Sequence, residues 1–525
     1  MGAVQQIAQD IHEPDCRRRW QMHRRRSPMD GRARQEFFER MTNSLDPGAG
    51  AKIGRPDATG AAGRRLVLVL TCAAQFMCVL DDTIVNVALP SIQHDLGFSN
   101  ASLAWVVNGY LVTFGGLLLL AGRASDLFVR RTVFMTGLVV FGAASMTCGL
   151  SNTPAMLVAS RVAQGVGAAL MSAAALAILA VTFTGAERDR AFGVWGALSG
   201  VAGVAGMLLG GTLTSWLSWR WVFLINVPIV LAVAVLSPRF VPAGRAARGP
   251  ALDPLGAITV TAGLGLLIFA IVQTERVGWD SVVTLTCMAG AAALLALFVV
   301  VEARHRAPML RLAVFRLRNV SGGVVCGILL ASAMLALFFF LTLYMQRVLG
   351  YSAFETGLAY LPMSLAVILV AGGLASRLIS RFGFKPLLVL GFALIAGALV
   401  WFAQIDVGSS YVSDLLWPAL IAGAGLGTTL VSVVTTVMHA LSGEGESGLA
   451  SGLVSTTQQM GGALGIAVLS AIAFSRADAA NGGAPAEPSD LTEGFQVAFY
   501  AAAALALAGI VVALVVTTSG RARQR

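Results

Sequence analysis

The chain has 525 residues, of which 56% are hydrophobic and only 12% are charged. A soluble chain of this length carries about twice that charged fraction, so the composition excludes an ordinary multi-domain cytosolic enzyme. The formal net charge of +10 could indicate nucleic-acid binding, but the basic residues lie mainly in short polar connections between apolar runs, where charge orients a membrane protein. We therefore expect an all-α integral membrane protein without a nucleic-acid partner.

An arginine-rich segment, residues 16–34, precedes the first apolar run. It could bind nucleic acid or anionic lipid; the interpretation that we favour is a disordered, positively charged cytoplasmic tail over residues 1–64. No short apolar region with a small-residue cleavage site follows this stretch, so we predict no signal peptide. A start at Met41 instead of Met1 would remove the stretch and leave every apolar run intact.

The apolar runs between residues 65 and 518 are long enough, at about 20 residues each, to cross a hydrocarbon core of about 30 Å. They predict fourteen membrane spans. A flexible outer loop is expected over residues 476–494, before the last span. The predicted spans are 66–89, 103–121, 132–150, 155–182, 190–214, 219–237, 254–273, 281–301, 319–346, 354–376, 384–404, 412–440, 447–474 and 495–518.

The distribution of arginine predicts the orientation of these spans. An even number of spans places both termini on one side of the membrane. If that side is the cytoplasm, the inner connections hold nearly all of the arginines between spans, and the outer ones hold only Arg220, Arg276, Arg347 and Arg476. This asymmetry follows the positive-inside rule, so we predict cytoplasmic termini.

Three ionisable residues lie deep inside predicted spans: Asp81 and Asp82 in the first and Arg161 in the fourth. Such groups are costly in a bilayer and indicate function. At a rise of about 1.5 Å per residue, Asp81 lies about 13 Å and Arg161 about 9 Å below the outer ends of their spans. We expect the two to pair in an aqueous cavity. The pair is either a proton switch, whose carboxylate changes proton occupancy when the arginine moves away, or a static salt bridge that fixes helix register.

Asp82 points about 100° away from Asp81 around the helix and cannot serve the same partner. It is either a second, substrate-facing charge or an interfacial residue. Asp82, Asn86 and Gln164 are the candidates for the lining of a substrate cavity.

The fifth predicted span carries a periodic row of glycines. Their spacing of three or four residues leaves one helix face without side chains over about four turns, so another helix can pack there closely. This face is either structural packing alone or a contact that lets two bundles move against each other and seals one side of a cavity. The glycines are Gly196, Gly200, Gly203, Gly206, Gly210 and Gly211.

The connection between the second and third spans reads GRASDLFVRR, residues 122–131. It begins at Gly122 and holds one acid, Asp126, among arginines that include Arg130 and Arg131. This composition suits an intracellular charge latch that forms in one conformation and breaks in another; in isolation it would be an ordinary solvated charge run.

A second connection, residues 376–386, echoes the first one with the sequence SRLISRFGFKP. Arg377 matches Arg123 and Lys385 matches Arg131, whereas Ser380 stands where the first copy has the acid. Weak echoes between halves are typical of transporters built from repeats. We expect a weaker latch, or none, in the second copy.

Taken in order, these segments resemble the fourteen-span drug:proton antiporter family of the major facilitator superfamily over essentially all of residues 65–518. Val129 stands where the family usually has glycine, and Met207 where proline is common. The motifs that carry the resemblance are LDDTIVNVALP (80–90), GRASDLFVRR (122–131), RVAQGVGAAL (161–170), SGVAGVAGMLLGG (199–211), WRWVFLINVP (219–228) and SGLASGLVSTTQQMGGALG (447–465).

The resemblance implies a major facilitator fold and an alternating-access exporter of the bacterial cytoplasmic membrane. Asp81 and Arg161 take the place of the family's proton-coupling pair, with the proton as coupling ion and no other cofactor. The implied substrate is a hydrophobic or cationic small molecule such as a drug, antibiotic or secondary metabolite, and the implied functional unit is a monomer in the lipid bilayer. The implied parts are the tail 1–64, a six-helix bundle 65–237, two additional spans 238–318, a second six-helix bundle 319–518 and a cytoplasmic tail 519–525.

Two alternatives remain. The first is a proton-coupled transporter of one specific metabolite or siderophore. The second is a membrane enzyme or sensor, which the sequence disfavours: four of the five histidines lie in tails or connections, and no phosphate-binding loop or metal-ligand spacing occurs.

Overall fold

The computed structural model of the chain describes residues 61–243, 253–305, 308, 310, 312–441, 447–481 and 487–518. The basic stretch 16–34 and the predicted tail 519–525 lie outside these residues. The described helices all belong to one compact unit, Asp57–Arg525.

Fourteen helical segments of the described chain are long and apolar enough to span a membrane, which confirms the predicted number. Most ends agree with the prediction to within about five residues. The first, second and tenth spans extend further, to Leu96, Leu127 and Phe382, and the last span begins earlier, at Pro488. The spans are formed in order by α4 (Ala61–Leu96), α5 (Asn100–Leu127), α6 (Arg130–Gly149), α7 (Pro154–Thr182), α8 (Gly185–Trp216), α9 (Trp221–Leu224) with α10 (Asn226–Phe240), α11 (Pro254–Val277), α12 (Val282–Arg304), α13 (Arg318–Arg347), α14 (Ala353–Ala359) with α15 (Leu361–Leu369), η2 (Val370–Leu374) and α16 (Ala375–Phe382), α17 (Phe384–Phe402), η3 (Tyr411–Leu416) with α18 (Trp417–Ala440), α19 (Ser447–Asn481) and α20 (Pro488–Val515).

The flexible loop predicted over residues 476–494 is wrong for most of its length. Helix α19 continues to Asn481, and α20 begins at Pro488. Alanine in the segment RADAAN favours continued helix, and Glu487 starts α20 with a capping box in which Asp490 takes part. The prediction from polar residues alone therefore made this connection too long.

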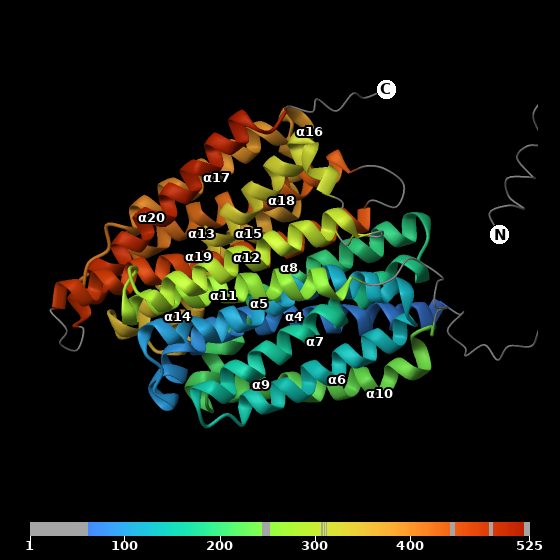
Figure 1. Ribbon diagram of the computed structural model, residues 1–525, viewed down its shortest axis with the longest axis horizontal. Coiled ribbons are helices and arrows are strands. Elements are labelled where there is room, and N and C mark those ends of the chain that lie inside the picture. Colours follow the sequence, from blue (N-terminus) through green and yellow to red (C-terminus); the bar gives the residue numbers. More distant parts are fainter. Residues whose placement is uncertain are drawn as a thin grey trace, which may run out of the picture. The chain divides into compact units, whose positions relative to one another are not determined.

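Helix contacts follow the two predicted bundles. Helices α4 to α10 pack among themselves, as do α13 to α20 (Figure 1). The two groups meet where α5 contacts α19, where α4 contacts α13, and where α8 contacts α14 and α15. Helix α10 ends at Phe240, past the predicted boundary at residue 237.

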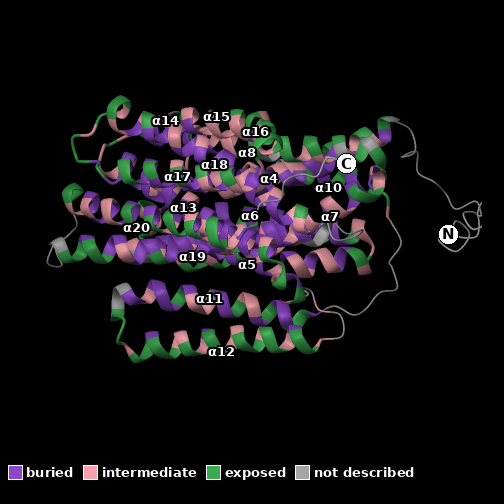
Figure 2. Cartoon of the chain, turned by 90° about the horizontal axis from the view of Figure 1, so that it is seen from above, coloured by how far each residue is buried: buried purple, intermediate pink, exposed green. Residues whose placement is uncertain are grey.

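The seventh and eighth spans, α11 and α12, form a pair beside α5 and α19 (Figure 2). Helix α11 touches α5 of one bundle and α19 of the other. It approaches α5 closely because Gly116 leaves room for Thr261, and the rings of Trp105 and Phe269 lie 6.5 Å apart. The α11–α12 pair therefore borders both bundles at their α5–α19 contact.

The sequence echo between the two connections has a structural counterpart. Arg131 at the start of α6 donates a hydrogen bond to the carbonyl of Pro238 near the end of α10 (2.8 Å). Lys385 at the start of α17 donates to the carbonyls of Leu514 (2.7 Å) and Thr517 (2.8 Å) at the end of α20. In both bundles, a basic residue from the repeated connection binds the free carbonyls at the end of the bundle's last helix.

We expect Lys385→Met to lower the free energy of unfolding by about 1–2 kcal/mol, because the helix end loses one ammonium group and the two hydrogen bonds that it donates. Thermal unfolding of the purified protein measures this effect. Arg377→Met is the control, since Arg377 is an exposed cation on the same connection. Equal stability of the two variants would contradict the capping role.

The glycine row of α8 divides into two halves. Gly206 and Gly210 pack against α4, where a Cβ on Gly210 would lie 2.6 Å from the backbone oxygen of Ile84. Gly211 packs against the backbone of α14. The prediction of close packing is confirmed for this half. Helix α8 runs unbroken through Met207, so this helix has no break at the position where the family often has proline.

The other half of the row makes no such contact. A Cβ on Gly196, Gly200 or Gly203 would meet no described atom within 4 Å. The prediction of one continuously packed face is therefore wrong for this half. Gly372 and Gly373, in η2 of the other bundle, are equally open. The glycine face of this half of α8 is therefore unpacked in the conformation described.

Candidate functional site

A fully buried polar network joins the first, third, fourth and sixth spans. It is centred on Asp81 of α4 and Arg161 of α7, which form an ion pair with side chains 0% and 1% exposed. Gln164 stands one turn after Arg161 on α7, so both side chains reach the same neighbour. The pairing predicted from span depth is confirmed. The predicted aqueous setting is wrong, because the protein itself surrounds both charges.

The Asp81 carboxylate accepts hydrogen bonds at both oxygens. Arg161 Nη1 donates to Oδ2, while Gln164 Nε2 (2.7 Å) and Asn226 Nδ2 (2.8 Å) donate to Oδ1. Ser145 Oγ accepts from the same two amides, at 2.9 Å and 3.0 Å. Buried charge is tolerated when it is paired and its remaining hydrogen-bonding capacity is used, which is the arrangement here.

The Arg161 guanidinium is held on several sides. Nε donates to the backbone oxygen of Val106 (2.8 Å), and Nη1 also donates to Gln164 Oε1 (2.8 Å). The ring of Tyr110 lies against the guanidinium, with its centroid 4.4 Å from Cζ. A planar group with several donors is required for this combination of a carboxylate, two oxygens and an aromatic face.

We expect Arg161→Lys to insert and fold but to transport at least about tenfold more slowly. The lysine ammonium cannot reproduce the fork, and each lost charge-assisted hydrogen bond is worth about 1.5–3 kcal/mol. Substrate efflux from membrane vesicles, normalised to the amount of folded protein, measures the loss. Transport at the wild-type rate would show that the positive charge alone is sufficient.

Two members of the network were not predicted as site residues. Asn226 lies inside the motif WRWVFLINVP but was given no role. It follows a break in the sixth span at Ile225, between α9 and α10, and is 0% exposed. Ser145 lies on α6 and donates to the backbone oxygen of Phe223 (3.1 Å). Neutral polar side chains carry little signal in an apolar run, so the sequence singled out neither one.

The three substrate-cavity candidates have different surroundings. Gln164 is 0% exposed and belongs to the buried network, so it lines no cavity in the conformation described. Asp82 is partly exposed, and its Oδ1 has no hydrogen-bond partner among the described residues. Asn86 is 1% exposed and donates from Nδ2 to the backbone oxygen of Asp82 (3.0 Å). Asp82 and Asn86 thus stay candidates for substrate contact.

The predicted loop latch is not closed in this conformation. None of the ion pairs between described residues involves Asp126, which is exposed on the last turn of α5. Arg131 binds the Pro238 carbonyl instead, and Gly122 has room for a side chain. Val129 has φ −64°, which any residue adopts, so the turn needs no glycine. The latch, including Arg130, stays a prediction.

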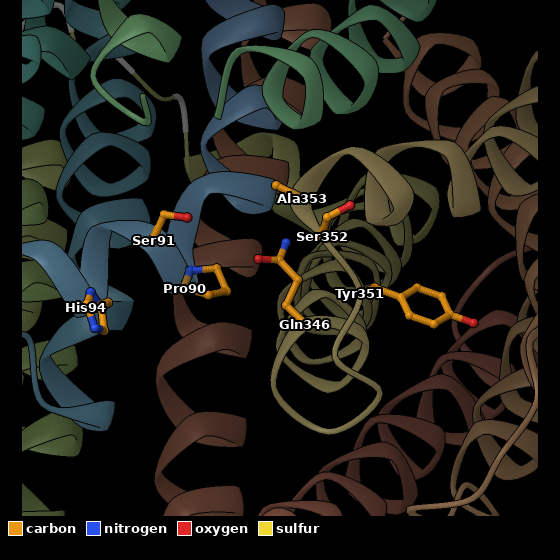
Figure 3. Close-up of a pocket in the computed structure, with 7 residues that line it drawn as sticks. All are labelled: Pro90, Ser91, His94, Gln346, Tyr351, Ser352 and Ala353. Carbon is orange, nitrogen blue, oxygen red and sulfur yellow. The ribbon is translucent and has the colours of Figure 1, made fainter. Parts of the chain in front are cut away.

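The bundles touch each other at the end of the spans that the arginine distribution predicts to be outer. Gln346 of α13 donates to the backbone oxygen of Val87 (2.8 Å), and Arg347 donates to Asn100 Oδ1 (3.0 Å). A pocket lies beside these contacts, with residues of α4 on one side and of the segment around α13 and α14 on the other (Figure 3). It is lined by Pro90, Ser91, His94, Gln346, Tyr351, Ser352 and Ala353.

Helices α8 and α14 complete the contact at this end. The backbone N–H of Phe354 donates to Ser215 Oγ (3.0 Å), and the rings of Phe354 and Trp216 lie 5.7 Å apart. A Cβ on Gly357 would lie 2.7 Å from the backbone oxygen of Met207. Close contact at one end of α8 and open space at the glycines of its other half show that the two bundles are closed on each other at the end that the arginine distribution predicts to be outer.

Fourteen spans, twelve of them in two bundles of six, with a charged network sealed inside one bundle, define a polytopic membrane transporter of the major facilitator type. Residues 71–466 match the sequence profile of the Major Facilitator Superfamily. The chain belongs to this superfamily.

Several bacterial relatives are similar over most of their length. The chain is 39% identical to the cephamycin export protein CmcT of Amycolatopsis lactamdurans, covering 87% of this chain and 93% of that one. It is 36% identical to the puromycin resistance protein pur8 of Streptomyces alboniger (86% and 91%). It is 31% identical to the multidrug transporter protein MdtP of Bacillus subtilis (79% and 76%). The predicted resemblance to drug-exporting members of the superfamily is confirmed.

Solved structures support the fold. A bacterial homologue of the human lysosomal transporter Spinster, in an inward-facing and unoccupied conformation, superposes with a TM-score of 0.62 at 16% identity, covering 87% of this chain and 97% of that one. The nucleoside transporter NupG gives 0.61 at 12% identity, covering 87% and 100%.

Proposed function

We propose that this protein exports hydrophobic or cationic small molecules, such as antibiotics or other secondary metabolites, across the bacterial cytoplasmic membrane in exchange for protons. The observation that carries the proposal is the fully buried Asp81–Arg161 network in a chain that resembles antibiotic exporters. The Asp81 carboxylate is buried within the membrane-spanning bundle. Protons can therefore reach it from either side of the membrane only when the surrounding helices move.

The coupling role rests on the way that Asp81 is held. Its negative charge is stabilised by one guanidinium and two amides, all from other helices of the same bundle. A movement of α7 or α10 relative to α4 would remove donors and make protonation favourable. Return of the donors would expel the proton. The static alternative, in which the ion pair only fixes helix register, uses the same contacts but predicts transport without proton exchange.

The orientation and the location of the transporter are inferred from the distribution of arginine and from its bacterial relatives. The arginine asymmetry supports cytoplasmic termini, and the bacterial relatives support the cytoplasmic membrane. The transporter would act as a monomer, with the alternating-access pathway between its own two bundles. No other coupling ion or cofactor is needed for this cycle.

Inside-out vesicles that contain a pH-sensitive dye test the function. After the lumen has been acidified, a transported compound added outside should enter in exchange for luminal protons, so the dye should report a rise in luminal pH. Vesicles with empty vector are the control. If hydrophobic cations and antibiotics give no response while one polar metabolite or siderophore does, the alternative of a specific proton-coupled transporter is correct.

A further inference from the structure

We propose that Asp82 and Asn86 form a binding subsite for a protonated amine of the transported molecule, separate from the Asp81–Arg161 network. The inference rests on the proposed export function and deepens it by naming the substrate class. The two residues are one helical turn apart on α4, so their side chains lie on the same face. We call them the acceptor pair.

The amide of Asn86 has a fixed orientation. Its Nδ2 donates to the backbone oxygen of Asp82 (3.0 Å). In the opposite orientation, the amide oxygen would face this carbonyl oxygen, and two acceptors cannot form a hydrogen bond. Oδ1 is therefore the atom that remains, and it is buried without a partner among the described residues. An unsatisfied buried acceptor costs about 1–3 kcal/mol, so this atom calls for a donor from outside the described chain.

The carboxylate of Asp82 has the same need. Its Oδ1 is buried and unpartnered, and no ion pair between described residues involves it. The nearest buried cation, Arg161, already binds Asp81, Gln164 and the Val106 carbonyl. An ionised carboxylate accepts hydrogen bonds but cannot donate one. What the acceptor pair lacks is therefore a group that is positively charged and donates hydrogen bonds.

The contrast with the neighbouring acid supports separate roles. Asp81 is 0% exposed and receives donors at both oxygens, so a ligand cannot reach it in the conformation described. Asp82 is partly exposed and has such capacity. The face of α4 that carries the acceptor pair continues to Gln75, whose side-chain oxygen accepts from Ser172 of α7 (2.9 Å). A polar row of this kind can guide an amine without using the coupling pair.

Two matched pairs of ligands test the proposal by equilibrium binding to the purified full-length protein in lipid nanodiscs. The first pair is puromycin and N-acetylpuromycin, and the second is daunorubicin and N-acetyldaunorubicin; acetylation removes the cation and keeps the scaffold. The wild type should bind at least one amine about tenfold or more tightly than its acetylated form. Asp82→Asn should abolish this preference by weakening binding of the amine alone, and Asp82→Glu should retain it.

Asn86→Leu should weaken amine binding by a smaller factor, since it removes a neutral acceptor and keeps the charge. Asp280→Asn is the control, because Asp280 is an exposed acid in the connection between α11 and α12. Thermal unfolding identifies variants that have lost their fold. Equal wild-type affinity within both pairs, absence of amine binding, or parallel loss of amine and acetylated ligand in folded Asp82→Asn would each overturn the proposal.

Proton exchange in the vesicle assay distinguishes a failure of the amine subsite from a failure of the proposed function. In the vesicle assay, Asp82→Asn should still exchange protons for a transported compound without a cationic group. Loss of that exchange would make Asp82 a proton carrier and overturn the proposal. If wild-type vesicles exchange no protons with any compound while the amine preference persists in nanodiscs, the coupling function fails and the amine subsite stands.

Discussion

Asp81→Asn is expected to reduce proton-coupled efflux to the level of vesicles without the protein, while the variant still inserts and folds. Asparagine has nearly the same shape but cannot take up and release a proton in the physiological range. Without that step, substrate movement has no proton to exchange, whatever the affinity for substrate. Luminal pH and substrate uptake, recorded on the same inside-out vesicles, measure the two fluxes.

The fold of this variant should survive because Arg161 is not left without partners. It keeps the Val106 carbonyl, the Gln164 side-chain oxygen and the Tyr110 ring, and the new amide still offers one acceptor oxygen. Removal of one partner from a buried ion pair usually costs about 3–5 kcal/mol, so a lower unfolding temperature is expected with cooperative unfolding retained.

Asp280→Asn is the matched control, because it makes the same chemical change at an exposed acid. It should leave both fluxes unchanged. Continued efflux of substrate by Asp81→Asn against its gradient, with proton exchange intact, would remove Asp81 from the coupling step. Facilitated movement down the substrate gradient alone is compatible with the proposal, because an uncoupled carrier still alternates.

The sequence was sufficient for the spans and for the central ion pair. Long apolar runs have no alternative in a bilayer but helix, which explains why all fourteen predicted spans are found. Charged residues inside such runs are costly enough to demand a partner. Their similar depths below the same membrane face then selected Arg161 as the partner of Asp81.

The surroundings of the pair could not be predicted to the same extent. Asn226 and Ser145 are ordinary polar residues within spans, and only the helix arrangement brings them to Asp81. Gln164 could have been assigned correctly, because its position one turn after Arg161 places it on the same helix face. The expectation of an aqueous cavity was wrong since these neutral donors replace water around the carboxylate.

The glycine row of α8 shows a similar limit. The spacing of the glycines fixes which face of the helix is bare, but it does not say where along that face a neighbour lies. Gly206, Gly210 and Gly211 have close neighbours, whereas Gly196, Gly200 and Gly203 have none within 4 Å. Packing depends on the relative tilt of helices that are distant in sequence, and on the conformation of the transporter.

This division predicts opposite results for the same substitution at two positions on α8. Gly206→Val should destabilise the protein, because its side chain would overlap Thr83 and the backbone of Ile84 on α4. Overpacking of this kind costs about 1–3 kcal/mol. Gly200→Val should leave the stability of the described conformation unchanged, since its side chain would enter open space.

Transport should respond differently from stability. Alternating access requires the open half of α8 to approach the other bundle when the outer end separates, and a bare face allows the closest approach. Gly200→Val should therefore slow efflux by about tenfold although the protein is fully folded, because a closed state destabilised by about 1.4 kcal/mol is populated tenfold less. Thermal unfolding and vesicle efflux of both variants measure the two effects. Wild-type efflux by Gly200→Val would mean that this face stays open throughout the cycle, and that the outer half of the row alone accounts for the glycines' role in packing.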